Sequence, residues 1–126
     1  LKEYVEDYAA RYGIAVDLAI GEEEWTLGGA AEAAIFRIAQ EALTNVRKHA
    51  AASRVAVTLR RETGSAEVTI VDNGKGFAAA AARARARANR SLGLTGMEDR
   101  AAALGGTLTL ESKPGETRVR AAFPVP

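Results

Sequence analysis

Apolar residues recur at intervals of three and four along two stretches of the chain, which is the spacing of a helix with one buried side. The first stretch runs from Leu1 to Arg11 and stops before Gly13, a residue type that tolerates the left-handed turn after a helix. The second and clearest stretch runs from Ala31 to Ala50. The apolar positions of the first are Leu1, Tyr4, Val5, Tyr8 and Ala9, and those of the second are Ile35, Ile38, Ala39, Ala42, Leu43 and Val46.

Alternation of apolar with polar or small residues predicts five strands with one buried face each. The alternating positions are Ile14, Val16, Leu18 and Ile20; Val55, Val57 and Leu59; Val68 and Ile70; Leu108 and Leu110; and Thr117, Val119, Ala121 and Phe123. Short turns at Gly64–Ser65 and Pro114–Gly115 favour mostly antiparallel pairing. The predicted fold class is therefore α+β: a two-layer sandwich in which helices cover one face of a single mixed, mostly antiparallel sheet.

Two further segments separate these elements. Gly21 to Gly29 is predicted to be a loop, whereas Ala78 to Arg90 consists almost only of alanine and arginine and lacks a clean apolar face. After it, Thr95 and Glu98 fit a capping box, in which a threonine and a glutamate satisfy free amides at a helix start. The short helix predicted there has Leu94, Met97, Ala101 and Leu104 on one side and ends at Gly105 and Gly106.

Length and charge limit the classes of protein that this chain can belong to. Its 126 residues suit one domain over residues 1–126, and 17 basic against 16 acidic residues argue against a dedicated nucleic-acid binder. The arginines of the alanine-rich segment do not change this, because no aromatic residues lie between them to stack on bases. The chain has no cysteine, and no apolar run approaches the roughly 20 residues of a membrane span. We expect a cytoplasmic location, which is compatible with a membrane anchor elsewhere in a full-length protein.

Three polar residues follow one edge of the long predicted helix. Glu41, Asn45 and Lys48 are spaced by four and three, so they flank the apolar stripe on the same side. A carboxylate, an amide and an amine at one edge could hold a metal ion and its phosphates. From the helix alone, an ordinary solvated edge with a Glu-to-Lys pair is the favoured interpretation. The only histidine, His49, lies near the border of the stripe and suits a structural or phosphate-adjacent role better than catalysis.

Two polar residues occupy core-facing positions at strand ends. Asp72 shares its strand face with Val68 and Ile70 and precedes a glycine-rich turn, Asn73 to Gly76. A buried carboxylate needs partners, and glycines let a planar ligand approach the backbone. A plain Asp-Asn-Gly turn would look the same. Thr117 lies on the core face of the last strand, where it either serves the site or bonds to the backbone at a strand start.

Gly93 and Gly96 precede the short predicted helix. Free amides and the helix dipole at such a position favour an anion such as phosphate, although ordinary loops often produce the same spacing.

Taken together and in order, these segments resemble the catalytic domain of sensor histidine kinases, in the branch that pairs with helix-turn-helix response regulators. Gln40 to Ala50 (QEALTNVRKHA) resembles the N box of that family, and Asp72 to Phe77 (DNGKGF) resembles its first glycine box. Gly93 to Arg100 (GLTGMEDR) resembles the second glycine box, and Thr107 to Phe123 resembles the closing hairpin. The resemblance covers essentially the whole chain. It implies the Bergerat ATP-binding fold, which is shared with gyrase, a heat-shock chaperone and mismatch-repair ATPases.

The same resemblance implies roles for residues of the long helix. Asn45 would coordinate Mg²⁺ bound to the phosphates of ATP, and Glu41 would be the N-box acid, near the metal or acting as a base. Lys48 and His49 would lie near phosphate or ribose.

Roles for the glycine boxes follow in the same way. Asp72 would accept a hydrogen bond from the adenine amino group, Gly74 and Gly76 would make room for the base, and Thr117 would support Asp72 through a water. The second glycine box would contribute Gly93, Leu94, Gly96 and Met97 to the nucleotide site. Ala78 to Leu92, within a lid region of about residues 78–95, would form a mobile ATP lid that we expect to be poorly ordered without nucleotide, because it can bury little surface to offset its ordering entropy.

The implied activity is transfer of the γ-phosphoryl group of ATP to a histidine on a separate dimerisation segment, with a response regulator as an indirect partner. The alternatives are a serine kinase of the anti-sigma-factor type and a nucleotide-binding module that does not catalyse. The isolated domain is expected to be a monomer and not to phosphorylate itself, because no His-Asp or His-Glu acceptor motif precedes the N box. One departure from the family lies in the closing hairpin, where Pro114-Gly115-Glu116-Thr117 has one glycine fewer than the usual Gly-x-Gly-Thr.

Overall fold

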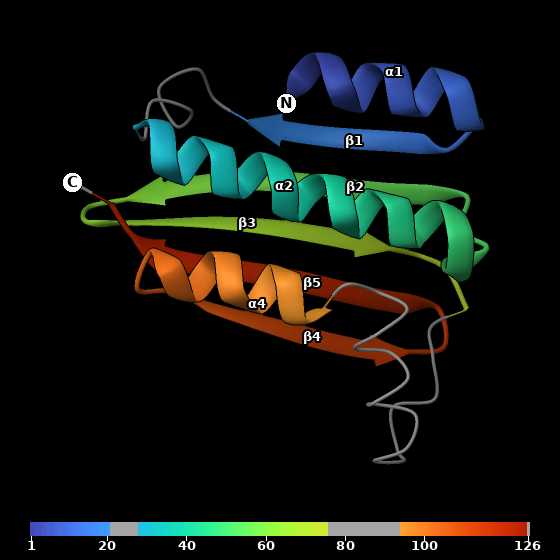
Figure 1. Cartoon of the computed structure of the whole chain (residues 1–126). Coiled ribbons are helices and arrows are strands. Elements are labelled where there is room, and N and C mark those ends of the chain that lie inside the picture. Colours follow the sequence, from blue (N-terminus) through green and yellow to red (C-terminus); the bar gives the residue numbers. More distant parts are fainter. Residues whose placement is uncertain (21–27, 76–93, 126) are drawn as a thin grey trace.

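The computed structural model describes residues 1–20, 28–75 and 94–125, with only the backbone described at positions 49 and 50. Its helices are α1 (Lys2–Tyr12), α2 (Gly29–Asn45), the π-helical turn η2 (Val46–Ala50) and α4 (Leu94–Ala103). Its strands are β1 (Ala15–Ile20), β2 (Arg54–Glu62), β3 (Ser65–Asp72), β4 (Thr107–Lys113) and β5 (Glu116–Pro124). The helices lie together on one side of the sheet (Figure 1).

The five strands form one sheet in the order β1-β2-β3-β5-β4. The β1–β2 pairing is parallel, and the three others are antiparallel. Two of the antiparallel pairs are hairpins whose turns contain Gly64 and Gly115, both with positive φ. The predicted fold class is confirmed: a mixed, mostly antiparallel sheet with helices over one face.

The core lies between this sheet and the helices. Side chains of β2, β3 and β5 alternate between buried and exposed, as a sheet covered on one face requires. Fully buried members include Ile35 and Ile38 of α2, Val57 of β2 and Val68 of β3, each at 0% exposure. At about 1.5–3 kcal/mol for each fully buried aliphatic side chain, this layer stabilises the framework on which the polar residues below are mounted.

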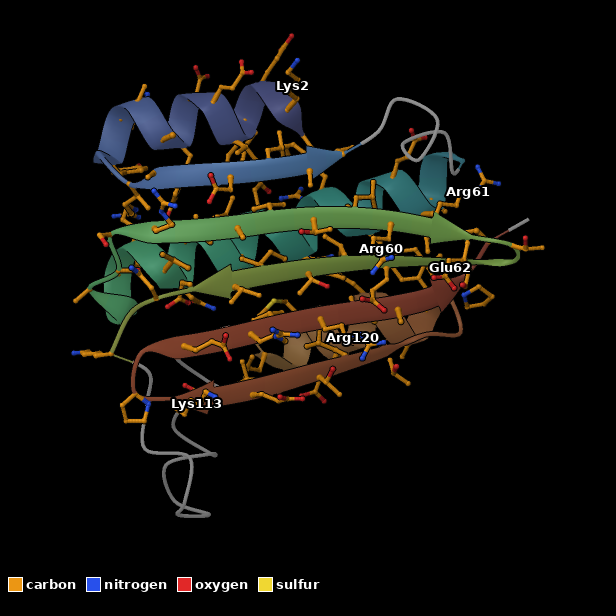
Figure 2. All side chains as sticks on the ribbon, turned by 180° about the vertical axis from the view of Figure 1, so that it is seen from behind. Lys2, Arg60, Arg61, Glu62, Lys113 and Arg120 are labelled. Carbon is orange, nitrogen blue, oxygen red and sulfur yellow. The ribbon has the colours of Figure 1, made fainter. Side chains whose placement is uncertain are left out.

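The opposite face of the sheet carries polar side chains. Figure 2 views it from behind, with Arg60 and Arg120 labelled. Arg120 and Glu67 form an ion pair across β5 and β3 with 2.7 Å between nitrogen and oxygen, and Arg54 lies 3.6 Å from Asp17. These side chains are largely exposed, so the pairs add little stability.

Glycines follow the ends of helices α1 and α4, and each of these helices is followed in the sequence by a strand. Gly13 takes the left-handed conformation (φ 64°) and its N–H bonds to the Ala9 carbonyl, as the sequence predicts for the end of α1. After α4, the N–H of Gly106 bonds to the Ala101 carbonyl. A Cβ at Gly106 would lie 2.3 Å from the Ala122 carbonyl oxygen, so only glycine fits between α4 and β5.

Three sequence-based boundaries need correction. The long helix begins at Gly29 rather than Ala31, and its α-helical part ends at Asn45 instead of continuing to Ala50. The capping box is also wrong, because α4 already includes Leu94 and Thr95 lies inside the helix. Of the predicted loop Gly21 to Gly29, Gly29 belongs to α2, and positions 21–27 lie outside the described residues. The alanine- and arginine-rich segment also lies outside them, whereas the last two positions of the predicted lid region 78–95, Leu94 and Thr95, belong to α4.

Candidate functional site

A row of polar side chains crosses the covered face of the sheet at the end of β3. Asp72 pairs in register with Thr117 of β5, which pairs with Ser112 of β4. Asp72 and Thr117 are 5% and 6% exposed, and they are the buried polar residues among those the structure describes. The Ser112 and Thr117 hydroxyl oxygens lie 2.8 Å apart in a hydrogen bond. The prediction that Asp72 and Thr117 both face the core is confirmed.

Asp72 closes a tight turn on itself. The N–H of Gly74 donates to Asp72 Oδ1 at 2.8 Å, which is an Asx turn. Burial raises the pKa of the Asp72 carboxyl above its usual 3.8, and the Gly74 N–H partly opposes that rise. A buried carboxylate that a structure keeps despite its desolvation cost is a candidate for binding a hydrogen-bond donor.

Hydrogen bonds to both neighbours fix this turn in place. Asn73 Oδ1 accepts the N–H groups of Ser53 and Arg54 at 3.0 Å each, and Asn73 Nδ2 donates to Ser53 Oγ at 3.0 Å. On the other side, the N–H of Gly115 in the β4–β5 turn donates to the Gly74 carbonyl at 3.0 Å. The end of β3 is therefore tied both to the segment that follows η2 and to the closing hairpin.

The N-box residues lie on α2 and η2. Glu41 is exposed on α2, Asn45 is its last residue and is partly buried, and Lys48 is exposed in η2. The spacing argument for one helix edge holds for Glu41 and Asn45. It does not carry over unchanged to Lys48, because a π-helical turn advances each residue by a smaller angle than an α-helix does. The backbone of His49 belongs to η2, and its side chain lies outside the described residues.

The second glycine box begins helix α4. Leu94 (6% exposed) and Met97 (1% exposed) are part of the core, so their side chains hold α4 against the sheet. Gly96 is exposed in the first turn, and a Cβ there would meet nothing within 4 Å. Gly76 and Gly93 lie outside the described residues. Roles of this box toward a ligand therefore stay predictions.

These parts meet at one end of the molecule. In Figure 1, α2 and β3 end at the same end of the sheet, and α4 begins on the side that faces this end. The positive end of the α4 dipole thus faces the end of the sheet at which α2 and β3 end. Within the described ranges, no three acidic or histidine side chains gather into a metal cluster. Along this edge of α2 the side chains with oxygen atoms are the Asn45 amide and the Glu41 carboxylate, the kinds of group that hard cations such as Mg²⁺ prefer.

Two residues of this arrangement escaped sequence analysis. Ser112 lies on the same face of its strand as Leu108 and Leu110. The alternation that identified Thr117 as core-facing could therefore also have placed Ser112 on the covered face. Asn73 looked like part of a plain turn, and only the sheet order shows that its side chain reaches Ser53.

Sequence comparison with known proteins matches residues 30–126 to the family described as histidine kinase-, DNA gyrase B-, and HSP90-like ATPase. The signal transduction histidine-protein kinase/phosphatase DegS of Brevibacillus brevis is 40% identical over 117 residues, and the sensor histidine kinase MctS of Rhizobium johnstonii is 37% identical over 117 residues. These alignments cover 92% and 93% of this chain but only 29% and 25% of the relatives.

Solved structures give the same picture of the fold. The ATP-binding domain of PrrB from Mycobacterium tuberculosis superposes with a TM-score of 0.73 at 27% identity, covering 96% of this chain and 88% of that domain. The histidine kinase domain of the blue-light activated kinase of Erythrobacter litoralis has a TM-score of 0.76 at 20% identity, over 95% of this chain and 60% of that one. None of the helices in the described part of the chain is long and apolar enough to cross a bilayer.

Proposed function

Because this chain belongs to the family of histidine kinase-, DNA gyrase B- and HSP90-like ATPases, we propose that it is the catalytic domain of a sensor histidine kinase and presents Mg-ATP to a histidine on a separate dimerisation segment. The observation that carries the proposal is the buried Asp72 carboxylate beside Thr117, at the end of the sheet where the N-box helix also ends. The chain spans only about a quarter of its curated relatives, so the activity of the whole protein is part of the proposal.

Asp72 is the residue proposed to select the base. Its carboxylate can accept a hydrogen bond from the amino group of adenine, whereas guanine would present a carbonyl oxygen at that position. Thr117 supports this acceptor from the neighbouring strand, and the buried Gly74 leaves room for a planar ring beside the turn. The low exposure of both side chains strengthens the preference, because an unmatched polar pair in a buried site is costly.

The N-box helix is proposed to hold the phosphates and the metal. Asn45 contributes an amide oxygen to Mg²⁺, and Glu41 lies one turn earlier on the same helix edge, near the metal or as a base. Lys48 and His49 follow in η2 and are proposed to contact phosphate or ribose. Gly93, Leu94, Gly96 and Met97 are proposed to bring backbone amides toward the phosphates at the start of α4, where the helix favours negative charge.

Bound ATP supplies the γ-phosphoryl group, and its transfer to a histidine nitrogen breaks the bond to the bridging oxygen and leaves ADP. The contribution of this chain is positioning and charge neutralisation, as in other phosphoryl transfers. The acceptor histidine is proposed to lie on a dimerisation segment of the same kinase, from which a response regulator then takes the phosphoryl group. The domain itself is proposed to act as a monomer in the cytoplasm.

The test combines the chain with γ-labelled ATP, Mg²⁺ and a separately produced histidine-bearing dimerisation segment of a sensor kinase. We expect acid-labile, alkali-stable label on that segment and none on this chain incubated alone. Label on serine would instead favour the anti-sigma-factor type of kinase, and ATP binding without transfer to any segment would favour a non-catalytic module. Failure to bind ATP at all, measured by calorimetry, would contradict the proposal.

A further inference from the structure

Helix α1 carries three tyrosines at four-residue spacing, and each contacts the N-box helix or its extension. The rings of Tyr4 and Phe36 meet edge to face with centroids 5.5 Å apart. The Tyr8 hydroxyl donates a hydrogen bond of 2.7 Å to the backbone carbonyl of Leu43. Tyr12 packs edge to face on Tyr8 at 5.3 Å and lies under the guanidinium of Arg47 at 4.7 Å. This tyrosine stripe therefore follows α2 from its middle to η2.

The hydrogen bond from the Tyr8 hydroxyl to the Leu43 carbonyl is buried. Tyr8 is 4% exposed, and burial raises the pKa of its hydroxyl to about 12, with the neighbouring Arg47 opposing the rise. The phenol therefore stays protonated and remains a donor throughout the physiological range of pH. Its acceptor is a main-chain carbonyl 35 residues later in the sequence, so the bond is a long-range tie between two helices.

This tie falls where the helix changes its geometry. The N–H of Val46 is shared between the carbonyls of Ala42 and Leu43, and from Val46 the helix continues as a π-helical turn that ends at Ala51 in the left-handed conformation (φ 51°). Such turns depart from the regular hydrogen-bond ladder and occur often at functional sites. The left-handed conformation costs an alanine about 1–2 kcal/mol, so contacts elsewhere must favour this path of the chain. A donor from outside the helix at Leu43 is one such contact.

From this geometry we propose that Tyr8 is a positioning residue for the phosphate end of the nucleotide site. Through the Leu43 carbonyl it holds the π-helical turn, which fixes Lys48 relative to Asn45. Arg47, held on the Tyr12 ring in the same turn, adds a second and weaker support. The inference rests on the proposed function, since it takes Asn45 and Lys48 to face the phosphates.

The experiment compares Tyr8→Phe with Tyr4→Phe, which also removes one hydroxyl from the stripe but leaves the bond to Leu43 intact. Calorimetry measures the affinities for Mg-ATP and for adenosine, which carries no phosphate. We expect Tyr8→Phe to weaken Mg-ATP binding about tenfold, the scale of one buried hydrogen bond, and to leave adenosine binding within about twofold. Tyr4→Phe should change neither affinity.

A second readout needs no nucleotide. Amide hydrogen exchange in the free protein should become faster at residues 47–50 in Tyr8→Phe and stay unchanged in β2 and β3. Because Tyr12 is exposed, Tyr12→Leu keeps the test available if the Tyr8 variant folds poorly. It should weaken Mg-ATP binding about two- to threefold, again with adenosine unaffected.

The outcomes separate this inference from the proposed function. If the unaltered chain binds no nucleotide, the proposed function fails, and the exchange measurement still tests the link from Tyr8 to η2. If Mg-ATP binds and folded Tyr8→Phe binds it equally well, the inference alone is overturned. Equal losses for Mg-ATP and adenosine would also overturn it, because Tyr8 would then act on the base end or on the whole fold.

Discussion

Replacing Asp72 by asparagine separates the cost of burying this carboxylate from its value for binding. Asparagine has nearly the same shape, and its Oδ1 can still accept the Gly74 N–H that lies 2.8 Å away. What changes is the charge in a site where Asp72 is 5% exposed. The substitution therefore leaves the turn in place while it removes the desolvated anion.

The effect on stability follows from the raised pKa of Asp72. The folded protein binds a proton at this carboxyl more tightly than the unfolded chain does. The stability that the group contributes is thus fully present below its unfolded pKa and is lost as the pH rises through its folded pKa. Above that folded pKa the ionised Asp72 lowers the free energy of unfolding. We expect Asp72→Asn to raise the melting temperature at pH 7, and the gain to shrink as the pH falls from the folded pKa of Asp72 toward its unfolded value of 3.8.

The effect on binding has the opposite sign. If Oδ1 of the asparagine stays on Gly74, its amino group faces the amino group of adenine, and two donors oppose each other. A buried unmatched group costs about 1–3 kcal/mol. At 1.4 kcal/mol for each factor of ten, ATP affinity should fall about 5- to 150-fold, and the preference for ATP over GTP should narrow or vanish.

Calorimetry with ATP and GTP, together with thermal unfolding between pH 4 and pH 8, measures both effects. Asp17→Asn is the matched control, because Asp17 is an exposed strand residue whose ion pair with Arg54 spans 3.6 Å. It should leave stability within about 0.5 kcal/mol and ATP affinity unchanged. A lower melting temperature for Asp72→Asn at pH 7, or ATP affinity equal to that of the unaltered chain, would refute the reasoning.

Three further substitutions test other parts of the site and the fold. Asn45→Ala should weaken nucleotide binding in Mg²⁺ far more than in EDTA, since it removes an oxygen ligand that a hard cation prefers; an unchanged Mg²⁺ dependence would take Asn45 out of the site. Gly96→Ala should raise the melting temperature slightly, because a Cβ there meets nothing and alanine favours a helix by about 1 kcal/mol, yet it should weaken ATP binding if the ligand approaches this backbone closely. Gly106→Ala should lower the free energy of unfolding by about 2–3 kcal/mol, because its Cβ would lie 2.3 Å from the Ala122 oxygen and 2.5 Å from Phe123 Cβ; denaturant unfolding with an unchanged midpoint would show that β5 yields freely.

The predictions that held rest on local periodicity. Asp72 and Thr117 were placed on the covered face because side chains alternate along a strand, and this needs no knowledge of neighbouring strands. The left-handed end of α1 at Gly13 likewise depends on one residue. The three ordered motifs gave the family, which the match over residues 30–126 confirms.

What sequence could not supply are contacts between distant segments. The apolar stripe of α2 predicts one continuous helix through Ala50, yet the α-helix changes to a π-helical turn at Val46. This change lies beside the Leu43 carbonyl, which accepts a hydrogen bond from Tyr8 of another helix. The pairing of Thr117 with Ser112 and Asp72 depends on the order of strands in the sheet. The capping box failed for a simpler reason: Thr-x-x-Glu also fits inside a helix, and α4 begins one residue before Thr95.

The parallel pairing of β1 has a consequence for how the chain folds as it leaves the ribosome. Among the described strands β1 has one neighbour, β2, and Ala15 pairs with Arg54. At a synthesis rate of about 5–20 residues per second, the intervening stretch of about 40 residues takes about 2–8 s to appear. During that interval the nascent chain presents an unpaired strand with three apolar side chains, Val16, Leu18 and Ile20. Asp17, in the middle of this edge strand, places a charge where another chain would otherwise add by edge pairing.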